Sequence, residues 1–104
     1  MARFDVYAHP DVEMRKTTPY LLDVQNSFID SVATRVVIPM RERKLVNTPL
    51  RDLNPIFEIE GKSVVLDTTA MAAYPAARLK KPVARLASQA GVIASAMDNL
   101  FGGY

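Results

Sequence analysis

The stretch IFEIEGKSVVLD, residues 56–67, decides the fold class of this 104-residue chain. Apolar and polar residues alternate in its first half, and its second half contains a short apolar run, so both halves favour strands. The turn between them contains Gly61, which can adopt a positive φ without a steric cost, as a tight hairpin requires. We therefore expect a β-hairpin here and a mainly β protein around it.

A second hairpin is expected near the start of the chain. Residues 4–8 alternate between apolar and polar side chains, and residues 20–25 again favour a strand. Pro10 and the polar run at residues 11–18 interrupt the pattern between them. This arrangement predicts an antiparallel pair joined by a long loop.

Three segments outside the hairpins are less regular. Residues 36–38 form a short apolar run before Pro39, so we expect a strand that ends there, buried on both faces or at a sheet edge. Residues 41–55 contain prolines and basic residues, which predicts an irregular connection. Residues 68–74 combine alanines that favour a helix with threonines that favour a strand, and Pro75 ends whichever forms.

The last third of the sequence predicts one amphipathic helix. From Val83 onward apolar residues recur with i, i+3, i+4, i+7 spacing, Pro82 suits a first turn, and Gly102 suits an end near Phe101. Gly91 inside this helix indicates a close backbone approach, since glycine there costs up to about 1 kcal/mol relative to alanine. The small side chains of this helix favour packing on the sheet, and a groove offered to a partner is the alternative.

Basic residues crowd the start of the expected helix without an acid among them, at Arg78, Lys80, Lys81 and Arg85. Asp98 lies near its end, so both placements oppose the helix dipole. We infer that something other than helix stability selected these charges.

Composition limits the class of protein. Thirteen basic and eleven acidic residues give a net charge of +2, which disfavours a protein whose main work is coating nucleic acid. The length predicts a single domain over residues 1–104, and a sheet of this size often gains stability by pairing with a copy. The N-terminal residues contain no apolar segment, so we expect no signal peptide and no membrane span.

The sequence also offers little catalytic or metal-binding chemistry. It contains no cysteine, and its single histidine, His9, precedes Pro10 and is expected in a loop. Nucleotide-binding and hydrolase motifs are missing, and the close carboxylate pair Glu58 and Glu60 is expected on a solvent face. We therefore expect no catalytic residue, no metal and no cofactor. A binding protein remains, or an enzyme that works with arginine and hydroxyl groups.

Seven segments, in order along nearly the whole chain, resemble the CcdB family, the toxins of bacterial toxin–antitoxin modules. They are FDVY (4–7), LDVQ (22–25), FID (28–30), RVVIPM (35–40), LNPI (53–56), TTAMA (68–72) and LFGGY (100–104). No single segment is specific, but the set is.

The resemblance implies an SH3-like barrel of strongly bent antiparallel strands, a small accessory sheet and a C-terminal helix, in a homodimer. It also implies that residues 68–73 form a strand. Proteins of this kind are not enzymes; they bind the A subunit of DNA gyrase in the bacterial cytoplasm and trap the state in which DNA is cut. The C-terminal segment of a cognate antitoxin neutralises the toxin, and the pair contacts operator DNA through the antitoxin.

The resemblance further implies a gyrase-binding set that consists of Phe28, Ile29, Ser95, Asp98, Phe101, Gly102, Gly103 and Tyr104. The family ends in Trp-Gly-Ile, but this chain has Gly102 in place of the tryptophan and ends in Tyr104. Removal of an aromatic anchor costs about 2–4 kcal/mol of binding energy. We expect weakened, retargeted or species-specific poisoning, for which the Tyr104 ring compensates in part.

One residue assignment and two alternative functions stand beside this interpretation. The basic residues Arg41, Arg43 and Lys44 are expected to bind the antitoxin, because such segments tend to be acidic and opposite charge speeds association. A homologue that binds antitoxin without toxicity is one alternative function. A MazF-like endoribonuclease is another, with Arg35 and Thr34 or Thr68-Thr69 as its arginine and hydroxyl groups.

Overall fold

The computed structural model describes residues 1–29 and 31–102. Its strands and helix, in chain order, are β1 (Asp5–Ala8), β2 (Tyr20–Asp23), β3 (Thr34–Glu42), β4 (Ile56–Ile59), β5 (Lys62–Leu66), β6 (Ala72–Pro75), β7 (Ala84–Arg85) and α1 (Ala90–Phe101). Five 3-10 turns connect them, namely η1 (Glu13–Lys16), η2 (Arg43–Leu45), η3 (Thr68–Ala70), η4 (Ala76–Arg78) and η5 (Ala87–Gln89).

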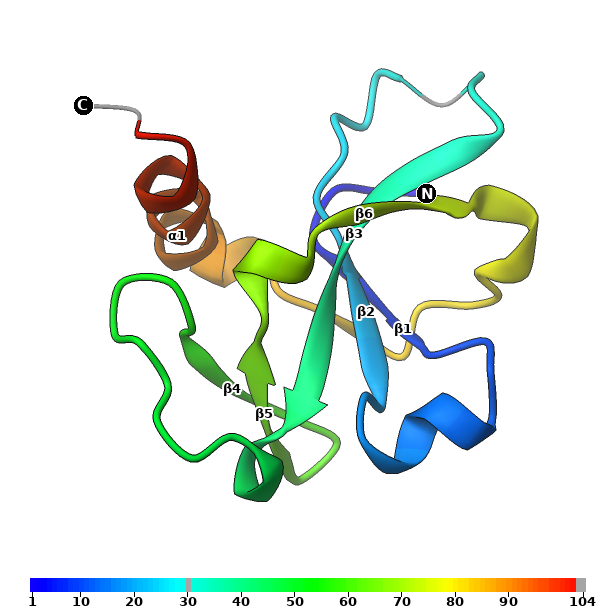
Figure 1. Cartoon of the computed structure of the whole chain (residues 1–104). Coiled ribbons are helices and arrows are strands. Elements are labelled where there is room, and N and C mark those ends of the chain that lie inside the picture. Colours follow the sequence, from blue (N-terminus) through cyan, green and yellow to red (C-terminus); the bar gives the residue numbers. More distant parts are fainter. Residues whose placement is uncertain (30, 103–104) are drawn as a thin grey trace.

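The strands form one bent antiparallel sheet in the order β4-β5-β3-β2-β1-β7, with β6 paired beside β3. The sheet curls into a nearly closed barrel, and α1 lies against one side of it (Figure 1). The expected barrel with a terminal helix is therefore confirmed. The accessory sheet implied by the resemblance is not a separate sheet among the described residues, because the β4–β5 hairpin continues the same sheet at the far end of β3.

Both expected hairpins are confirmed. β1 pairs with β2 in a register that places Tyr7 opposite Leu21, and a long connection containing η1 joins them. β4 and β5 meet through a tight turn in which Glu60 and Gly61 have φ values of 52° and 77°. Two consecutive positive φ angles match the right-handed twist of the flanking strands, which explains why this turn selects glycine.

β3 is longer than the sequence predicted, because it continues through Pro39 to Glu42. Pro39 lies where the partner of β3 changes from β6 to β5, and its carbonyl accepts the Asp67 N–H at 2.9 Å. Proline has no amide hydrogen to donate, but at this junction between the pairing with β6 and the pairing with β5 neither strand needs one from it. The strand therefore tolerates it.

The helix begins at Ala90 rather than at residue 83. The preceding segment forms β7, and its flanking amides at Val83 and Leu86 donate to the carbonyls of Val6 and Phe4 at 2.7 and 2.9 Å. An open strand edge thus captures residues whose apolar spacing also fits a helix, so tertiary pairing overrides local preference. The basic residues 78–85 consequently do not stand at the helix start, so the conflict expected there does not arise. Asp98 does lie in the last turn of α1 and opposes the dipole, as expected.

The strand implied for residues 68–73 is correct only in its last part. Thr68–Ala70 form η3, and β6 begins at Ala72 and ends at Pro75, where the sequence placed its end. The buried Thr68 hydroxyl donates to the Leu53 carbonyl. This bond ties η3 to the long connection before β4 and keeps the segment out of the sheet.

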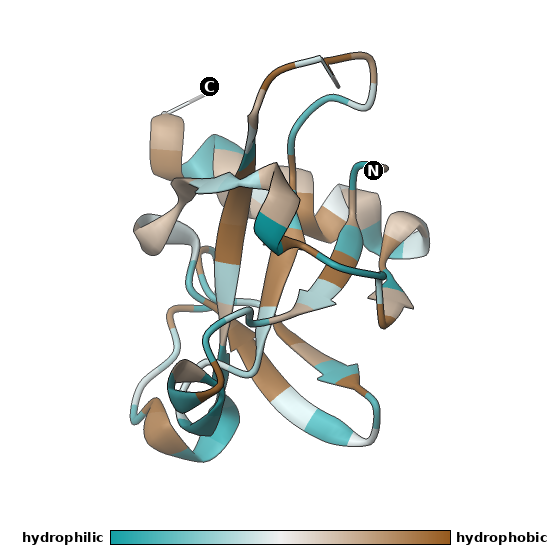
Figure 2. Cartoon of the chain, turned by 90° about the vertical axis from the view of Figure 1, so that its right-hand side faces the viewer, coloured by the Kyte–Doolittle hydropathy of each residue, from teal (hydrophilic) through white to brown (hydrophobic). Residues whose placement is uncertain are grey.

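The main core fills the barrel and continues under α1, where Ile93 and Ala96 are buried. Figure 2 shows the corresponding hydrophobic bands along the central strands. The opposite face of α1 is exposed at Val92 and Gly91, so one face packs and the other meets solvent. In the part of the chain that the structure describes, no heavy atom outside the helix's own backbone lies within 4 Å of the position that a Cβ would take at Gly91, so the close backbone approach expected there is not found.

Candidate functional site

The loop between β2 and β3 presents two apolar side chains to solvent. Phe28 is 94% exposed and Ile29 is 48% exposed. Asn26 shapes the turn, because its Oδ1 accepts the Phe28 N–H and its carbonyl accepts the Ile29 N–H, both at 3.0 Å. Large apolar side chains held this far into solvent indicate an interaction surface more than a packing role.

A buried ion pair anchors this loop. Arg35 donates from Nε to Oδ2 of Asp23 at 2.8 Å and from Nη2 to Oδ1 at 3.0 Å, and the two side chains are 1% and 0% exposed. Arg35 Nη1 also donates to the Ile29 carbonyl at 3.0 Å, and Nη2 donates to the Gln25 carbonyl at 3.3 Å. One guanidinium therefore joins two strands and fixes the loop that carries Phe28.

The same contacts bear on the ribonuclease alternative. The Arg35 guanidinium is buried and bonded to Asp23, and the Thr68 hydroxyl is buried and donates to a backbone carbonyl. A catalytic arginine or hydroxyl must reach the substrate. These groups are occupied inside the protein, so the ribonuclease alternative loses the arginine and one of the hydroxyl groups on which it depends.

The C-terminal helix supplies the second part of the expected gyrase-binding set. Phe101 is 68% exposed, and Ser95, Asp98 and Gly102 are exposed as well. Gly102 ends the helix in the left-handed conformation, with φ of 67°, and its N–H bonds to the Asp98 carbonyl. Gly103 and Tyr104 lie outside the described residues.

The loop and the helix end reach the same end of the molecule. Figure 1 shows the β2–β3 loop and the end of α1 at the top, and Figure 2 shows the same from the side. They remain separate segments of one protomer. Ser95 instead lies with Val92 and Asn99 in a cavity of about 220 Å³ between α1 and the connection before β4.

The basic residues expected to bind antitoxin lie at the end of β3 and in η2, so the connection after residue 41 is more ordered than predicted. An Arg41 Nη1 atom lies 3.8 Å from Oδ2 of Asp67. Arg43 Nη1 donates to the Val46 carbonyl at 2.9 Å, and Lys44 is exposed. Two of the three cations are thus partly engaged within the protein.

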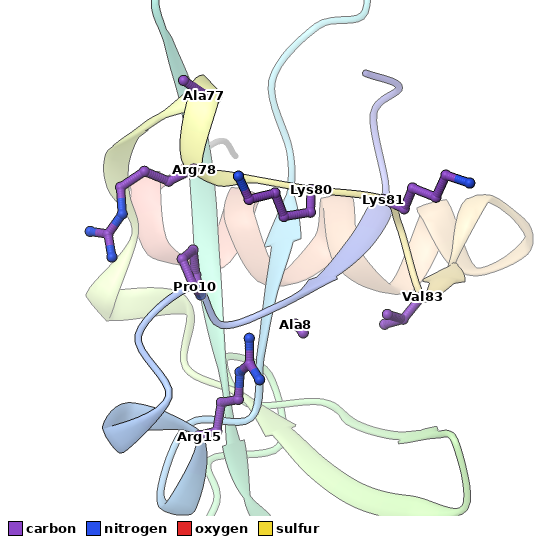
Figure 3. Close-up of a pocket in the computed structure, with 8 residues that line it drawn as sticks. All are labelled: Ala8, Pro10, Arg15, Ala77, Arg78, Lys80, Lys81 and Val83. Carbon is purple, nitrogen blue, oxygen red and sulfur yellow. The ribbon is translucent and has the colours of Figure 1, made fainter.

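The structure also contains a cavity that sequence reasoning did not find. It has a volume of about 400 Å³ and is lined by Ala8, Pro10, Arg15, Ala77, Arg78, Lys80, Lys81 and Val83 (Figure 3). The end of β1, η1 and the segment before β7 surround it. The signal that points to it in the sequence is the basic cluster at residues 78–85 without an acid.

His9 lies beside this cavity in the expected loop but is buried. Its Nδ1 accepts the Asp11 N–H at 3.0 Å, and its ring meets the Tyr74 ring edge-on with centroids 5.9 Å apart. Burial lowers the pKa of His9 below its ordinary value of 6.5, and the positive charges of Arg78 and Arg15 lower it further against an opposing effect of Asp11. His9 is therefore neutral in the neutral pH range.

We expect stability to depend on pH through His9. Because its pKa is lower in the folded state, the folded protein binds fewer protons, so stability is present above pH 6.5 and is lost as the pH falls below it. Urea unfolding at a series of pH values should show a steeper loss in the parent than in His9→Asn, which keeps an acceptor near Nδ1. Parallel curves for the two proteins would contradict this assignment.

The carboxylate pair Glu58 and Glu60 forms no catalytic or metal-binding site among the described residues. Glu58 and Glu60 are exposed, as predicted, and Glu60 accepts the Tyr20 hydroxyl at 2.7 Å. Burial and this bond raise the pKa of Tyr20 to about 12.

Within residues 1–29 and 31–102, no cluster of three or more His, Cys, Asp or Glu is placed to hold a metal ion. No helix in that part of the chain is long and apolar enough to cross a membrane.

The sequence also matches a known protein family. Residues 3–103 match the family described as CcdB protein. The matched range includes the β2–β3 loop, the strand β3 and the helix α1. This family consists of toxins of toxin–antitoxin modules that act as gyrase poisons and not as enzymes. Membership is consistent with the expectation that the chain is not an enzyme. The match confirms the resemblance noted in the sequence, and the chain belongs to the CcdB family.

Proposed function

We propose that this chain is a CcdB-like toxin that binds the A subunit of DNA gyrase in the bacterial cytoplasm and traps the complex in which DNA is cleaved. The family match over residues 3–103 carries the proposal. The toxin acts as a homodimer of a single domain, residues 1–104, and needs no cofactor. A cognate antitoxin neutralises it through a C-terminal segment, and operator DNA is bound through that antitoxin alone.

The proposed gyrase-binding surface is the end of the molecule at which Phe28, Ile29 and Phe101 are exposed. Aromatic and aliphatic anchors supply a disproportionate share of binding energy, and a loop held by buried hydrogen bonds loses less entropy on binding. The remaining members of the proposed surface are Ser95, Asp98, Gly102, Gly103 and Tyr104.

The antitoxin contact is proposed at Arg41, Arg43 and Lys44. Lys44 is exposed, and the two arginines are only partly engaged by neighbouring groups. An acidic segment would meet a cationic corner there, which speeds association.

Poisoning is expected to be weaker than in a protein with tryptophan at position 102. Gly102→Trp restores an aromatic anchor worth about 2–4 kcal/mol, but the φ of 67° strains any side chain there by about 1–2 kcal/mol. The balance predicts that the variant cleaves DNA at roughly tenfold lower concentration than the parent. The measurement is linear DNA released by denaturing gyrase after incubation with the toxin, supercoiled DNA and ATP.

Gly102→Ala is the matched control, because it carries the backbone strain without the indole ring. It should poison no better than the parent. Linear DNA with Gly102→Trp but none with the parent would mean that the docking mode is CcdB-like but that this protein has lost or redirected the activity. Antitoxin binding by the same non-toxic parent would then identify the alternative, a homologue that binds antitoxin without toxicity. If neither protein produces linear DNA at any concentration, gyrase is not the target.

A further inference from the structure

The cavity between η1 and the segment before β7 gathers four cations, namely Arg15, Arg78, Lys80 and Lys81. Figure 3 shows Arg15 entering from η1, while Arg78 and Lys80 come from the opposite wall. None of the described residues that line the cavity is acidic. Four cations along one cavity without a carboxylate among them are unfavourable for the protein alone, because like charges repel one another.

Neutral groups, not carboxylates, contact two of these cations, Arg15 and Arg78. Arg15 Nε donates to the His9 carbonyl at 2.6 Å, and Arg78 stacks over the Tyr74 ring at 5.5 Å and donates to its hydroxyl at 3.4 Å. Among residues 1–29 and 31–102, no ion pair within 4 Å involves any of the four. Their charge is therefore available to a ligand.

The rest of the lining is aliphatic. Ala8, Pro10, Ala77 and Val83 supply apolar surface, and the described lining contains no aromatic ring. Nucleic-acid bases need aromatic side chains on which to stack, so this surface suits an aliphatic side chain better than a base. A ligand that fits combines negative charge with a branched or straight aliphatic group.

The cavity also borders an open strand edge. β7 pairs with β1 at Asp5 and Val6 only, so the part of β1 that reaches Ala8 extends past the end of β7. Ala8 lines the cavity at this point. An extended peptide can add main-chain hydrogen bonds along such an edge while its side chains enter neighbouring pockets.

We propose that this cavity is a docking site for an extended acidic peptide segment of a partner protein, with an aliphatic residue in the pocket. Carboxylates of the segment meet Arg78, Lys80 and Arg15, and its aliphatic side chain packs on Pro10 and Val83. The site is separate from Arg41, Arg43 and Lys44 and from the proposed gyrase-binding end. It does not depend on gyrase poisoning.

The test uses the full chain and a fluorescein-labelled synthetic peptide that alternates glutamate with leucine and valine, followed by fluorescence anisotropy. Arg78→Glu with Lys80→Glu should weaken binding at least tenfold. Arg51→Glu with Lys62→Glu is the matched control, since it makes the same charge change at two exposed residues outside every proposed site, and it should leave the affinity within twofold. Circular dichroism melts verify that both double variants remain folded.

A second pair of probes separates charge from the aliphatic contact. A peptide of equal charge with serine in place of leucine and valine should bind several-fold more weakly than the first peptide. A single-stranded oligonucleotide of equal charge should bind more weakly than either. Equal losses in both double variants, equal affinity of the two peptides, or tighter binding of the oligonucleotide would each overturn the proposal.

Discussion

Replacing Arg35 by methionine is expected to lower the free energy of unfolding by about 3–5 kcal/mol, because it leaves the Asp23 carboxylate buried without its partner. Both side chains are almost fully buried and joined by two hydrogen bonds of 2.8 and 3.0 Å. A domain of this size is stable by about 5–15 kcal/mol in total. Urea unfolding of the variant measures the loss.

The control for this prediction is Arg85→Met. Arg85 also pairs with an aspartate of the sheet, Asp5, at 3.0 Å, but its side chain is 65% exposed. Solvent screens such a pair, so its removal should cost far less than that of Arg35. Similar losses of stability in the two variants would show that the buried Arg35–Asp23 ion pair contributes no more to stability than the exposed Arg85–Asp5 pair.

A double variant separates the buried charge from the loop contacts. Asp23→Leu combined with Arg35→Met removes both charges, so it should be more stable than Arg35→Met alone. It still loses the bonds to the Gln25 and Ile29 carbonyls, so stability should not return fully. The loop that carries Phe28 should then exchange its amides faster, even where the fold survives.

The hairpins were predictable from the sequence because their determinants are local. Gly61 and the alternation around it specify one turn and two strands, whatever the rest of the chain does. β7 and η3 were not predictable in the same way, since a distant strand edge and the buried Thr68 hydroxyl decide them. Pro39 ends a strand by local rules and is tolerated here because the partner changes at that residue.

The candidate sites divide along the same line. Exposure of Phe28, Ile29 and Phe101 agrees with the surface expected from the resemblance, whose role in gyrase binding stays a prediction. The Arg35–Asp23 pair escaped sequence reasoning, because two charges twelve residues apart give no sign that they meet in a buried position. The basic residues 78–85, which are unfavourable at a helix start, indicated that this segment has another role. The cavity itself could not be predicted, because its walls come from three separate segments of the chain.

Ile93→Ala is expected to lower the free energy of unfolding by about 2–5 kcal/mol, because it leaves a cavity where the helix meets the barrel. Ile93 is fully buried and packs in the same cluster as Leu86 and Phe57, whereas the neighbouring Val92 is 49% exposed. Val92→Ala removes a similar side chain from the same helix and should change stability by less than about 0.5 kcal/mol. Chemical denaturation of the three proteins measures the difference.

The contrast between these two variants reports how firmly α1 is docked. Among the described residues, Ile93 and Ala96 are the buried residues of α1, and Ala90 and Met97 are only partly buried, so Ile93 supplies much of the attachment. If α1 were held loosely, the helix would unfold locally and the two variants would cost about the same. A large loss of stability for Ile93→Ala but not for Val92→Ala means that the barrel fixes the helix and thereby the position of Phe101. A binding surface built jointly by the helix end and the β2–β3 loop requires a helix that is fixed in this way.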